Sequence, residues 1–147
     1  REEVDAYVQN AFETYRVLAA NFDRAFWESY LDKWAAMYGR RLRVKASQKN
    51  PLEFDMRARK RDFAAACETF FDAVLNGELA HNGDPVLRQH VLNAQRRPYQ
   101  GYVGISKEHR ESPRKIDAAV TAVLAFAARQ EVLKSRKGGG KRRVVLY

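Results

Sequence analysis

The sequence is poor in features that define several classes of protein. Cys67 is the one cysteine in 147 residues, so no internal disulfide can form, and its alanine and phenylalanine neighbours at helical spacing predict a buried thiol rather than a nucleophile. No apolar run approaches the roughly 18 residues that span a bilayer, and the opening residues Arg1–Asp5 do not resemble a signal peptide. We therefore expect a soluble, intracellular protein without a membrane partner.

Several catalytic motifs are also missing. The run Gly138–Lys141 invites a phosphate-loop interpretation, but Arg142 follows the lysine where Ser or Thr is required, and the pattern predicts no strand before it and no helix after it. The sequence has no HExxH, no paired cysteines, no GxSxG elbow and no internal repeat. Because the chain starts on Arg1 within an expected helix, without an initiator methionine, we expect it to be a piece of a longer protein.

Acidic residues are scarce in the C-terminal half. Residues 1–84 carry 13 Lys/Arg against 14 Asp/Glu, a net charge of −1, whereas residues 85–147 carry 14 against 4, a net charge of +10. This asymmetry favours a polyanionic partner, with nucleic acid first and an acidic membrane surface second. No basic amphipathic helix with a wide apolar face supports the membrane alternative.

What the first third of the sequence does contain is alternating helical and strand patterns. Apolar residues at helical spacing predict helices over 4–15 and 27–38, the second ending at Gly39. The apolar run over 16–22 predicts a buried strand closed by Asp23, and alternation over 41–46 predicts a second strand. A strand, a helix and a strand in this order predict a parallel pair.

The rest of the chain is predicted to be mostly helical. Asn50-Pro51 resembles a helix start, so we expect a long helix from there to Gly77, and Asp84-Pro85 caps a shorter one. Residues 101–106 form a strand candidate, and Ser112-Pro113 resembles the N-cap and first residue of the last helix. We expect a domain over residues 1–131 and a basic, flexible tail over 132–147.

The long helix is predicted to have an apolar face and a basic start. The apolar face is expected to be buried and consists of Phe63, Cys67, Phe70, Phe71 and Val74. The basic residues near the start are either solvated or in contact with DNA; they are Arg57, Arg59, Lys60 and Arg61.

Two aspartates and a histidine are the candidate site residues. Asp23 ends a buried strand, where open α/β sheets place ligands, but an aspartate just before a helix is also a favoured N-cap. Asp117 lies in the first turn of the last helix, on its packed side, where it either binds a ligand or complements the helix dipole. His81 is a ligand or base, or a structural hydrogen-bonding group, whereas His90 is expected half-buried and His109 exposed. Two such aspartates in a basic protein suggest Mg²⁺ or Mn²⁺ held between carboxylates and phosphate oxygens.

Three blocks in fixed order carry a family resemblance. They are His81-Asn82-Gly83-Asp84-Pro85-Val86-Leu87, His90-Val91-Leu92-Asn93-Ala94, and, after Lys107, Ser112 to Val120 with its Lys-Ile-Asp-Ala-Ala core. Together they resemble the C-terminal nuclease domain of tailed-bacteriophage large terminase subunits, over roughly residues 4–129. The resemblance implies a ribonuclease H-like α/β sheet flanked by helices. It also implies cleavage of concatemeric double-stranded viral DNA with two Mg²⁺ or Mn²⁺ ions, in the cytoplasm of the bacterial host.

The resemblance also assigns residues and partners. Asp117 matches the family's late, helix-borne catalytic and metal-binding aspartate, and Asp23 matches the acidic residue that ends the middle strand; His81 and Lys107 are expected near the site. The implied partners are double-stranded DNA, the terminase ATPase domain, the small terminase subunit and the portal. The candidate DNA-binding residues are Arg88, Arg96, Arg97, Lys107, Arg110, Arg114 and Lys115.

The sequence departs from the family in one respect. The family's first metal ligand is an aspartate on the opening strand, and nothing before Arg16 is predicted to be a strand, while Asp5 lies in a predicted helix. We therefore expect a partial nuclease domain that lacks its first strands. The alternative is a non-catalytic basic module that binds DNA or docks on a partner, in which Asp23 caps a helix and Asp117 complements a dipole.

Overall fold

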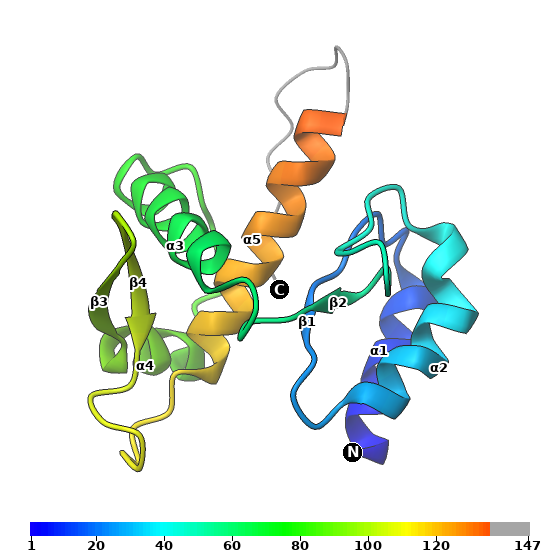
Figure 1. Cartoon of the computed structure of the whole chain (residues 1–147), viewed down its shortest axis with the longest axis horizontal. Helices are drawn as coiled ribbons and strands as arrows, with labels where there is room; N and C mark the ends of the chain where they lie inside the picture. The colour runs from blue at the N-terminus through cyan, green and yellow to red at the C-terminus, as the bar shows by residue number, and fades with distance from the viewer. Residues whose placement is uncertain (136–147) are drawn as a thin grey trace. The chain divides into compact units, whose positions relative to one another are not determined.

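A computed structural model describes residues 1–135, and these fold into two compact units. Unit 1 comprises Arg1–Met56 with the described residues from Ala128 onward, and unit 2 comprises Arg57–Ala127. The described residues contain five α-helices, one short 3-10 helix and two two-stranded sheets (Figure 1). The mixed α/β class expected from the sequence is thereby confirmed.

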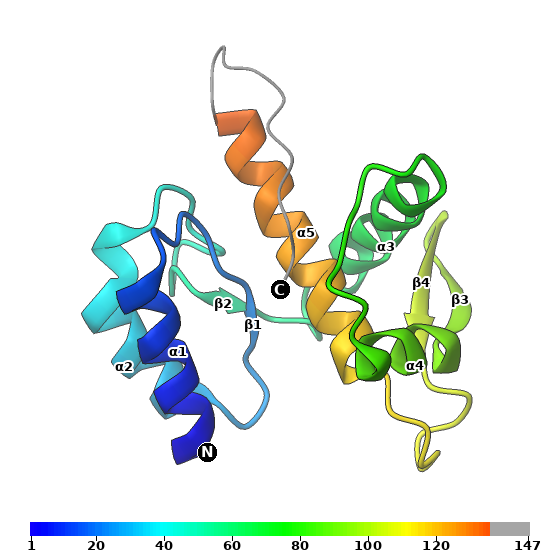
Figure 2. The same ribbon diagram turned by 180° about the vertical axis from the view of Figure 1, so that it is seen from behind.

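Unit 1 is built on two helices that pack side by side, α1 (Glu2–Thr14) and α2 (Glu28–Tyr38) (Figure 2). Both were predicted from their apolar stripes, and these stripes form the core that the helices share. The buried residues of this core are Val8, Phe12, Leu31, Trp34, Tyr38, Leu42 and Leu52. Partly buried Phe22, Trp27 and Tyr30 surround Trp34, with ring centroids 5.2–6.0 Å from its own. Unit 1 therefore has an aromatic core.

One carboxylate ties α1 to α2. Asp5 accepts hydrogen bonds from the Lys33 ammonium at 2.6 Å and from the Trp34 indole nitrogen at 2.7 Å. These donors, with Lys33 the stronger influence, hold the pKa of Asp5 below its ordinary value. The same hydrogen bond raises the pKa of Lys33. Asp5 thus has a structural role at the helix pair.

The sheet of unit 1 is a parallel pair, as predicted, but both strands differ from the predicted ones. β1 (Phe22–Asp23) pairs in parallel with β2 (Glu53–Phe54), and α2 lies between them in the chain. Of the strand predicted over 16–22 only Phe22 belongs to β1. The predicted strand over 41–46 is wrong. The backbone N–H groups of Arg43 and Val44 both donate to the single carbonyl of Leu18, so no ladder forms, and residues Gly39–Arg41 form the 3-10 helix η1.

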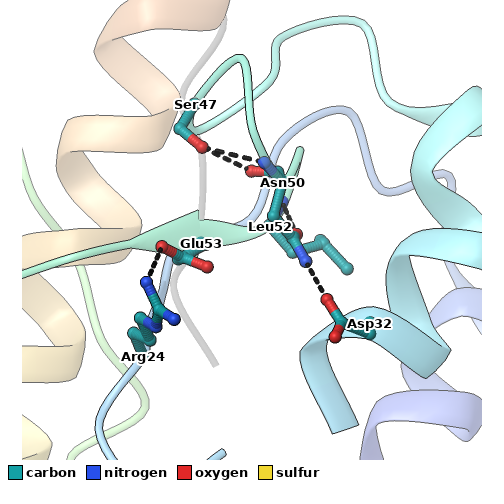
Figure 3. A network of polar contacts seen from close by, with 6 residues as sticks. All are labelled: Arg24, Asp32, Ser47, Asn50, Leu52 and Glu53. Carbon is teal, nitrogen blue, oxygen red and sulfur yellow. Dashed lines mark hydrogen bonds and ion pairs between the residues drawn. The ribbon is translucent and has the colours of Figure 1, made fainter. Parts of the chain in front are cut away.

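The predicted helix start at Asn50 is also wrong, because this residue organises a turn. Asn50 is buried, its Oδ1 accepts from the Leu52 N–H at 3.0 Å and its Nδ2 donates to Asp32 at 3.3 Å (Figure 3). Its backbone and the Ser47 hydroxyl also exchange two hydrogen bonds. A side-chain bond to the N–H two residues ahead occurs both in turns and at helix N-caps. Here it makes a turn, because the strand β2 follows at Glu53 and no helix does. This turn leads into β2.

The turn also explains why Gly39 is a glycine. Gly39 was predicted to follow the end of α2, where glycine commonly has a positive φ, but its φ is −56°. A Cβ atom at Gly39 would lie 2.8 Å from Cγ of Pro51, closer than side-chain atoms approach. Gly39 is therefore required by the close approach of Pro51 and not by its backbone conformation.

Unit 2 contains α3 (Lys60–Leu75), α4 (Pro85–Asn93), the strands β3 (Gln95–Tyr99) and β4 (Tyr102–Ser106), and the start of α5 (Asp117–Ser135). The short helix at Pro85 and the strand over 101–106 are confirmed. The long helix starts only at Lys60, and Gly77, with φ of +65°, follows its end as expected. Of its predicted buried face, Phe63 and Cys67 are buried, but Phe71 and Val74 are half exposed.

β3 and β4 form an antiparallel hairpin that packs on α3. Gln100 and Gly101, both at positive φ, make the two-residue turn, which suits a hairpin of this kind. The Val103 N–H donates to the Glu68 carboxylate of α3 at 2.8 Å. β3 was not predicted, because all five of its residues are exposed and it contains Pro98, so it lacks the alternation that identifies strands.

The last helix begins later and ends later than predicted. α5 starts at Asp117, while Ser112 and Pro113 lie in the preceding loop, where the Ser112 hydroxyl accepts from the Arg114 N–H at 3.2 Å. α5 continues to Ser135, so the first residues of the expected tail are helical, and residues 136–147 lie outside the described part of the chain. No helix in residues 1–135 is both long and apolar enough to cross a membrane.

Candidate functional site

The three sequence blocks that carry the family resemblance all lie in unit 2, and two of them meet at the start of α5. The first block forms the turn before α4. The His81 Nδ1 accepts from the Gly83 N–H at 3.0 Å, and the Asp84 carboxylate accepts from the Leu87 N–H at 2.8 Å. Asp84 is therefore the N-cap of α4, as predicted, with Pro85 following as first helical residue. His81 itself is exposed and has a local structural role in this turn.

The second block is the end of α4, and its polar side chains hold the third block. The His90 Nδ1 accepts from the Ala118 N–H at 2.9 Å, and the Asn93 Nδ2 donates to the Lys115 carbonyl at 2.9 Å. His90 is half-buried, as expected, but its hydrogen bond to the helix start was not anticipated. The two contacts fix the backbone on either side of Asp117.

The loop before α5 is held by a second set of contacts around Ser112, which is buried. The Lys107 ammonium donates to the Ser112 carbonyl at 3.3 Å, five residues before Asp117 in the chain. Arg97 donates to the Glu108 carbonyl at 2.9 Å, and Arg114 lies 3.8 Å from the Glu108 carboxylate. Two of the candidate DNA-binding arginines therefore meet at Glu108.

Asp117 is the first residue of α5 and is exposed, not turned toward packed surface as predicted. Within residues 1–135, its carboxylate has no hydrogen-bond or ion-pair partner. A carboxylate oxygen is the ligand that Mg²⁺ and Mn²⁺ prefer, so an exposed, unpaired aspartate fits a divalent ion. The same position at a helix N-terminus also suits complementation of the helix dipole.

Asp23 lies in unit 1, at the end of β1, and is half-buried. Asp23 ends a strand in the structure, as the sequence predicted. The capping alternative is wrong, because α2 begins five residues later, at Glu28, with Trp27 as its N-cap. Beside Asp23, the Arg24 guanidinium lies 3.6 Å from the Glu53 carboxylate of β2 (Figure 3). Phe26, in the same loop, is 73% exposed at a φ of +68°.

The two candidate aspartates thus belong to different units. Across residues 1–135, no group of three or more His, Cys, Asp or Glu side chains is placed to hold a metal ion. The candidate DNA-binding residues are all in unit 2, and Lys107 is the half-buried one. The exposed ones are Arg88, Arg96, Arg97, Arg110, Arg114 and Lys115.

Unit 2 also contains an apolar cavity of about 520 Å³. It lies between α3, the end of α4, the hairpin and α5, and its lining includes Cys67, Phe70, Val91, Ile105 and Val123. Burial raises the pKa of the Cys67 thiol to about 11, so the thiol is neutral at physiological pH, as expected for an unreactive cysteine.

The contacts at the start of α5 that sequence reasoning missed are those of His90 and Asn93. Their spacing of three residues places both side chains on one face of a helix, which was the available signal. The partners of that face are a backbone N–H and a backbone carbonyl, which are present at every residue. A sequence pattern therefore does not identify them.

Comparison with known proteins places the chain among bacteriophage sequences. It is 50% identical over 147 residues to the Gene 13 protein of Mycobacterium phage L5, covering 99% of this chain and 25% of that protein. It is 52% identical over 139 residues to the Gene 13 protein of Mycobacterium phage D29, covering 93% of this chain and 23% of that protein. The chain thus spans about a quarter of the length of these relatives. No family model and no solved structure matches. The similarity supports a bacteriophage origin.

Proposed function

We propose that the chain is part of the nuclease domain of a phage large terminase subunit, and that the complete protein cleaves concatemeric double-stranded DNA in the cytoplasm of the bacterial host. The observation that carries the proposal is the start of α5. There, two of the blocks that resemble the terminase family meet at an exposed aspartate, Asp117, without a partner among residues 1–135. The phage origin supported by the two relatives agrees with this proposal.

In this proposal Asp117 and Asp23 are ligands of two Mg²⁺ or Mn²⁺ ions in the complete domain. When bound, such ions supply an activated water and stabilise the leaving oxygen of a phosphodiester. The exposed arginines of unit 2 bind the DNA phosphates. The ribonuclease H-like sheet, the missing first strands and the terminase partners, namely the ATPase domain, small subunit and portal, belong to the same proposal. Support for the sheet comes from the parallel pair of β1 and β2 with Asp23 at its end.

The test uses the chain itself with supercoiled plasmid and Mn²⁺, beside Asp117→Ala. A matched control is Glu111→Ala, which removes an exposed acid from the loop before α5. Cleavage by the parent and the control, but not by Asp117→Ala, supports the proposal. In parallel, Mn²⁺ should broaden the amide NMR signals around residue 117 in the parent and not in Asp117→Ala. If Mn²⁺ leaves these signals unchanged in the parent, Asp117 is not a metal ligand.

A second function is favoured by a specific observation, the position of Asp117 in the first turn of α5, where it complements the dipole without any metal. In this alternative the chain is a non-catalytic module that binds DNA or docks on a partner. Salt-sensitive DNA binding without cleavage, and without a Mn²⁺ effect near residue 117, is the result that favours it.

A further inference from the structure

We propose that α3 and the hairpin of β3 and β4 form a surface that binds the phosphates of double-stranded DNA through two arginines that lie on aromatic rings. This surface deepens the proposed function, on which it rests, because it is where the DNA would be held. The Arg61 guanidinium lies 5.0 Å from the centroid of the Tyr102 ring, and the Arg96 guanidinium lies 5.9 Å from that of Phe71. Each pair joins one residue of α3 to one residue of the hairpin.

Neither guanidinium is used in a polar contact inside the protein. Both side chains are exposed, and within residues 1–135 neither guanidinium makes a hydrogen bond or an ion pair. Asp62 of α3 is paired with Arg59 at 2.8 Å. The other acids in the second half of α3, Glu68 and Asp72, form no ion pair in the same part of the chain. The two positive charges are therefore available to an anion outside the chain.

A guanidinium that lies on a ring is well suited to bind a phosphate. The ring attracts the cation and restricts its movement, while the N–H groups at the edge of the guanidinium stay free to donate. Paired N–H donors of arginine match the geometry of phosphate oxygens, and less side-chain freedom is lost on binding when the arginine is already held. We therefore expect Arg61 and Arg96 to contribute more to binding than freely solvated arginines do.

The rings are fixed because the hairpin packs closely on α3 (Figure 1). A Cβ atom at Gly104 would lie 3.4 Å from Cβ of Ala64, so a larger residue there would press on the helix. The Glu68 carboxylate accepts from the Val103 N–H at 2.8 Å. α3 and the hairpin therefore hold both stacked arginines on one stable support.

The spacing and the neighbouring charge suit a duplex. Arg61 and Phe71, the ring beneath Arg96, are ten residues apart on α3, which is about 15 Å of helix. Duplex DNA carries one charge per ~1.7 Å of its axis, so one duplex can contact both arginines. Lys60, also exposed, adds a charge beside Arg61, although basic residues in the first turn of a helix oppose its dipole and do not stabilise it. We assign this basic start of α3 to DNA contact.

The experiment measures duplex DNA binding by fluorescence anisotropy at several salt concentrations, in buffer with EDTA so that no metal-dependent cleavage occurs. Arg61→Gln and Arg96→Gln each remove a charge, whereas Arg61→Lys keeps the charge without the planar guanidinium and Tyr102→Leu removes one ring. Arg40→Gln, an exposed arginine of unit 1, is the matched control. Circular dichroism checks that each variant is folded.

The two kinds of variant should differ in their salt dependence. We expect each glutamine variant to bind about 5- to 10-fold more weakly, with the slope of log affinity against log salt reduced by about 1. Arg61→Lys and Tyr102→Leu should bind about 2- to 5-fold more weakly with the slope retained, because the stack is lost and the charge is kept. Arg40→Gln should bind as the parent does.

The outcomes separate this inference from the proposed function. If the parent does not bind the duplex in EDTA, or if the glutamine variants bind as Arg40→Gln does, the surface is overturned, whether or not Asp117→Ala abolishes cleavage. If only the glutamine variants are weaker, charge alone acts and the role of the rings is overturned. If Tyr102→Leu loses helix content, Arg61→Lys decides, because it leaves the hairpin intact. If the surface is supported but Mn²⁺ has no effect near residue 117, the surface stands and the metal site fails.

Discussion

Units 1 and 2 are stabilised in different ways. Unit 1 has a dense core, in which Leu31 and Trp34 are at most 1% exposed and four aromatic rings pack together. Unit 2 also has buried apolar residues, among them Phe63, Leu124 and Phe126, but it contains an apolar cavity as well. Its α4 has no buried residue and is tied to α5 by hydrogen bonds. The comparison therefore predicts that a substitution in the buried core of unit 1 lowers stability more than one at an exposed side chain of unit 2.

The largest expected effect is the replacement of a core leucine in unit 1. Leu31→Ala should lower the free energy of unfolding by about 2–5 kcal/mol, because it removes packed atoms and leaves a cavity. Phe71→Ala in unit 2 is the comparison variant, and because its side chain is 52% exposed the loss should stay below about 1 kcal/mol. Urea unfolding monitored by circular dichroism measures both. Equal losses would contradict the difference between the buried core of unit 1 and this exposed position of unit 2.

The next effect tests whether the cavity of unit 2 admits a thiol reagent. Burial raises the pKa of Cys67 to about 11, so the folded protein favours the neutral thiol. The stability that this preference contributes is therefore present below the ordinary cysteine pKa and is lost as the pH rises through the raised pKa. At pH 8 the thiolate fraction is roughly 100-fold lower than for an ordinary cysteine. Labelling should therefore be about 100-fold slower in the folded protein than in denaturant. Similar rates in the two conditions would show that Cys67 is freely accessible.

A smaller effect is expected on DNA binding, when an exposed arginine of each unit is replaced. Residues 57–127 carry 11 Lys/Arg against 8 Asp/Glu, and the candidate arginines are there. Arg88→Gln should weaken binding a few-fold and reduce the slope of log affinity against log salt by about 1. Arg40→Gln, an exposed arginine of unit 1, is the control and should change neither. Fluorescence anisotropy with duplex DNA at several salt concentrations gives both quantities.

The smallest expected effect concerns the acid stability of unit 1. Because the folded pKa of Asp5 is lowered by its hydrogen bond with Lys33, its contribution is present above the ordinary pKa near 4 and is lost as pH falls through the lower folded value. Asp5→Asn should flatten the dependence of Tm on pH in this acidic range. Glu13→Gln, an exposed acid of the same helix, should leave the dependence as it is. Parallel curves for Asp5→Asn and the parent would exclude this role.

Helices with a continuous apolar stripe were predictable from the sequence, and short strands were not. α1 and α2 follow their stripes closely, because burial of that face is what stabilises them. β1 and β2 have two residues each, too few for a period to develop, and their pairing depends on the turn at Asn50. A cap signature such as Asn50-Pro51 fits a helix start and a turn equally well, and tertiary contacts decide between them.

Candidate site residues could be named from the sequence, but the start of α5 that carries Asp117 could not be placed from it. The resemblance puts Asp117 and Lys107 in one candidate site, and in the structure Lys107 contacts Ser112 in the loop before α5. The start of α5 was misplaced, since Ser112-Pro113 satisfies the local rules for a cap while the actual acceptor, His90, lies 28 residues away from Ala118. Local capping rules do not include an acceptor that is supplied by another helix.

Phe26 is unfavourable in two ways, in its backbone conformation and in its exposure. A bulky side chain at positive φ strains the backbone, and its 73% exposure leaves an aromatic ring in water. Glycine adopts this conformation without strain, and asparagine adopts it more readily than phenylalanine does. Phe26→Gly or Phe26→Asn should therefore relieve the backbone strain and remove an exposed apolar ring. Either substitution is a rational first choice for preparing concentrated samples of the protein for crystallisation.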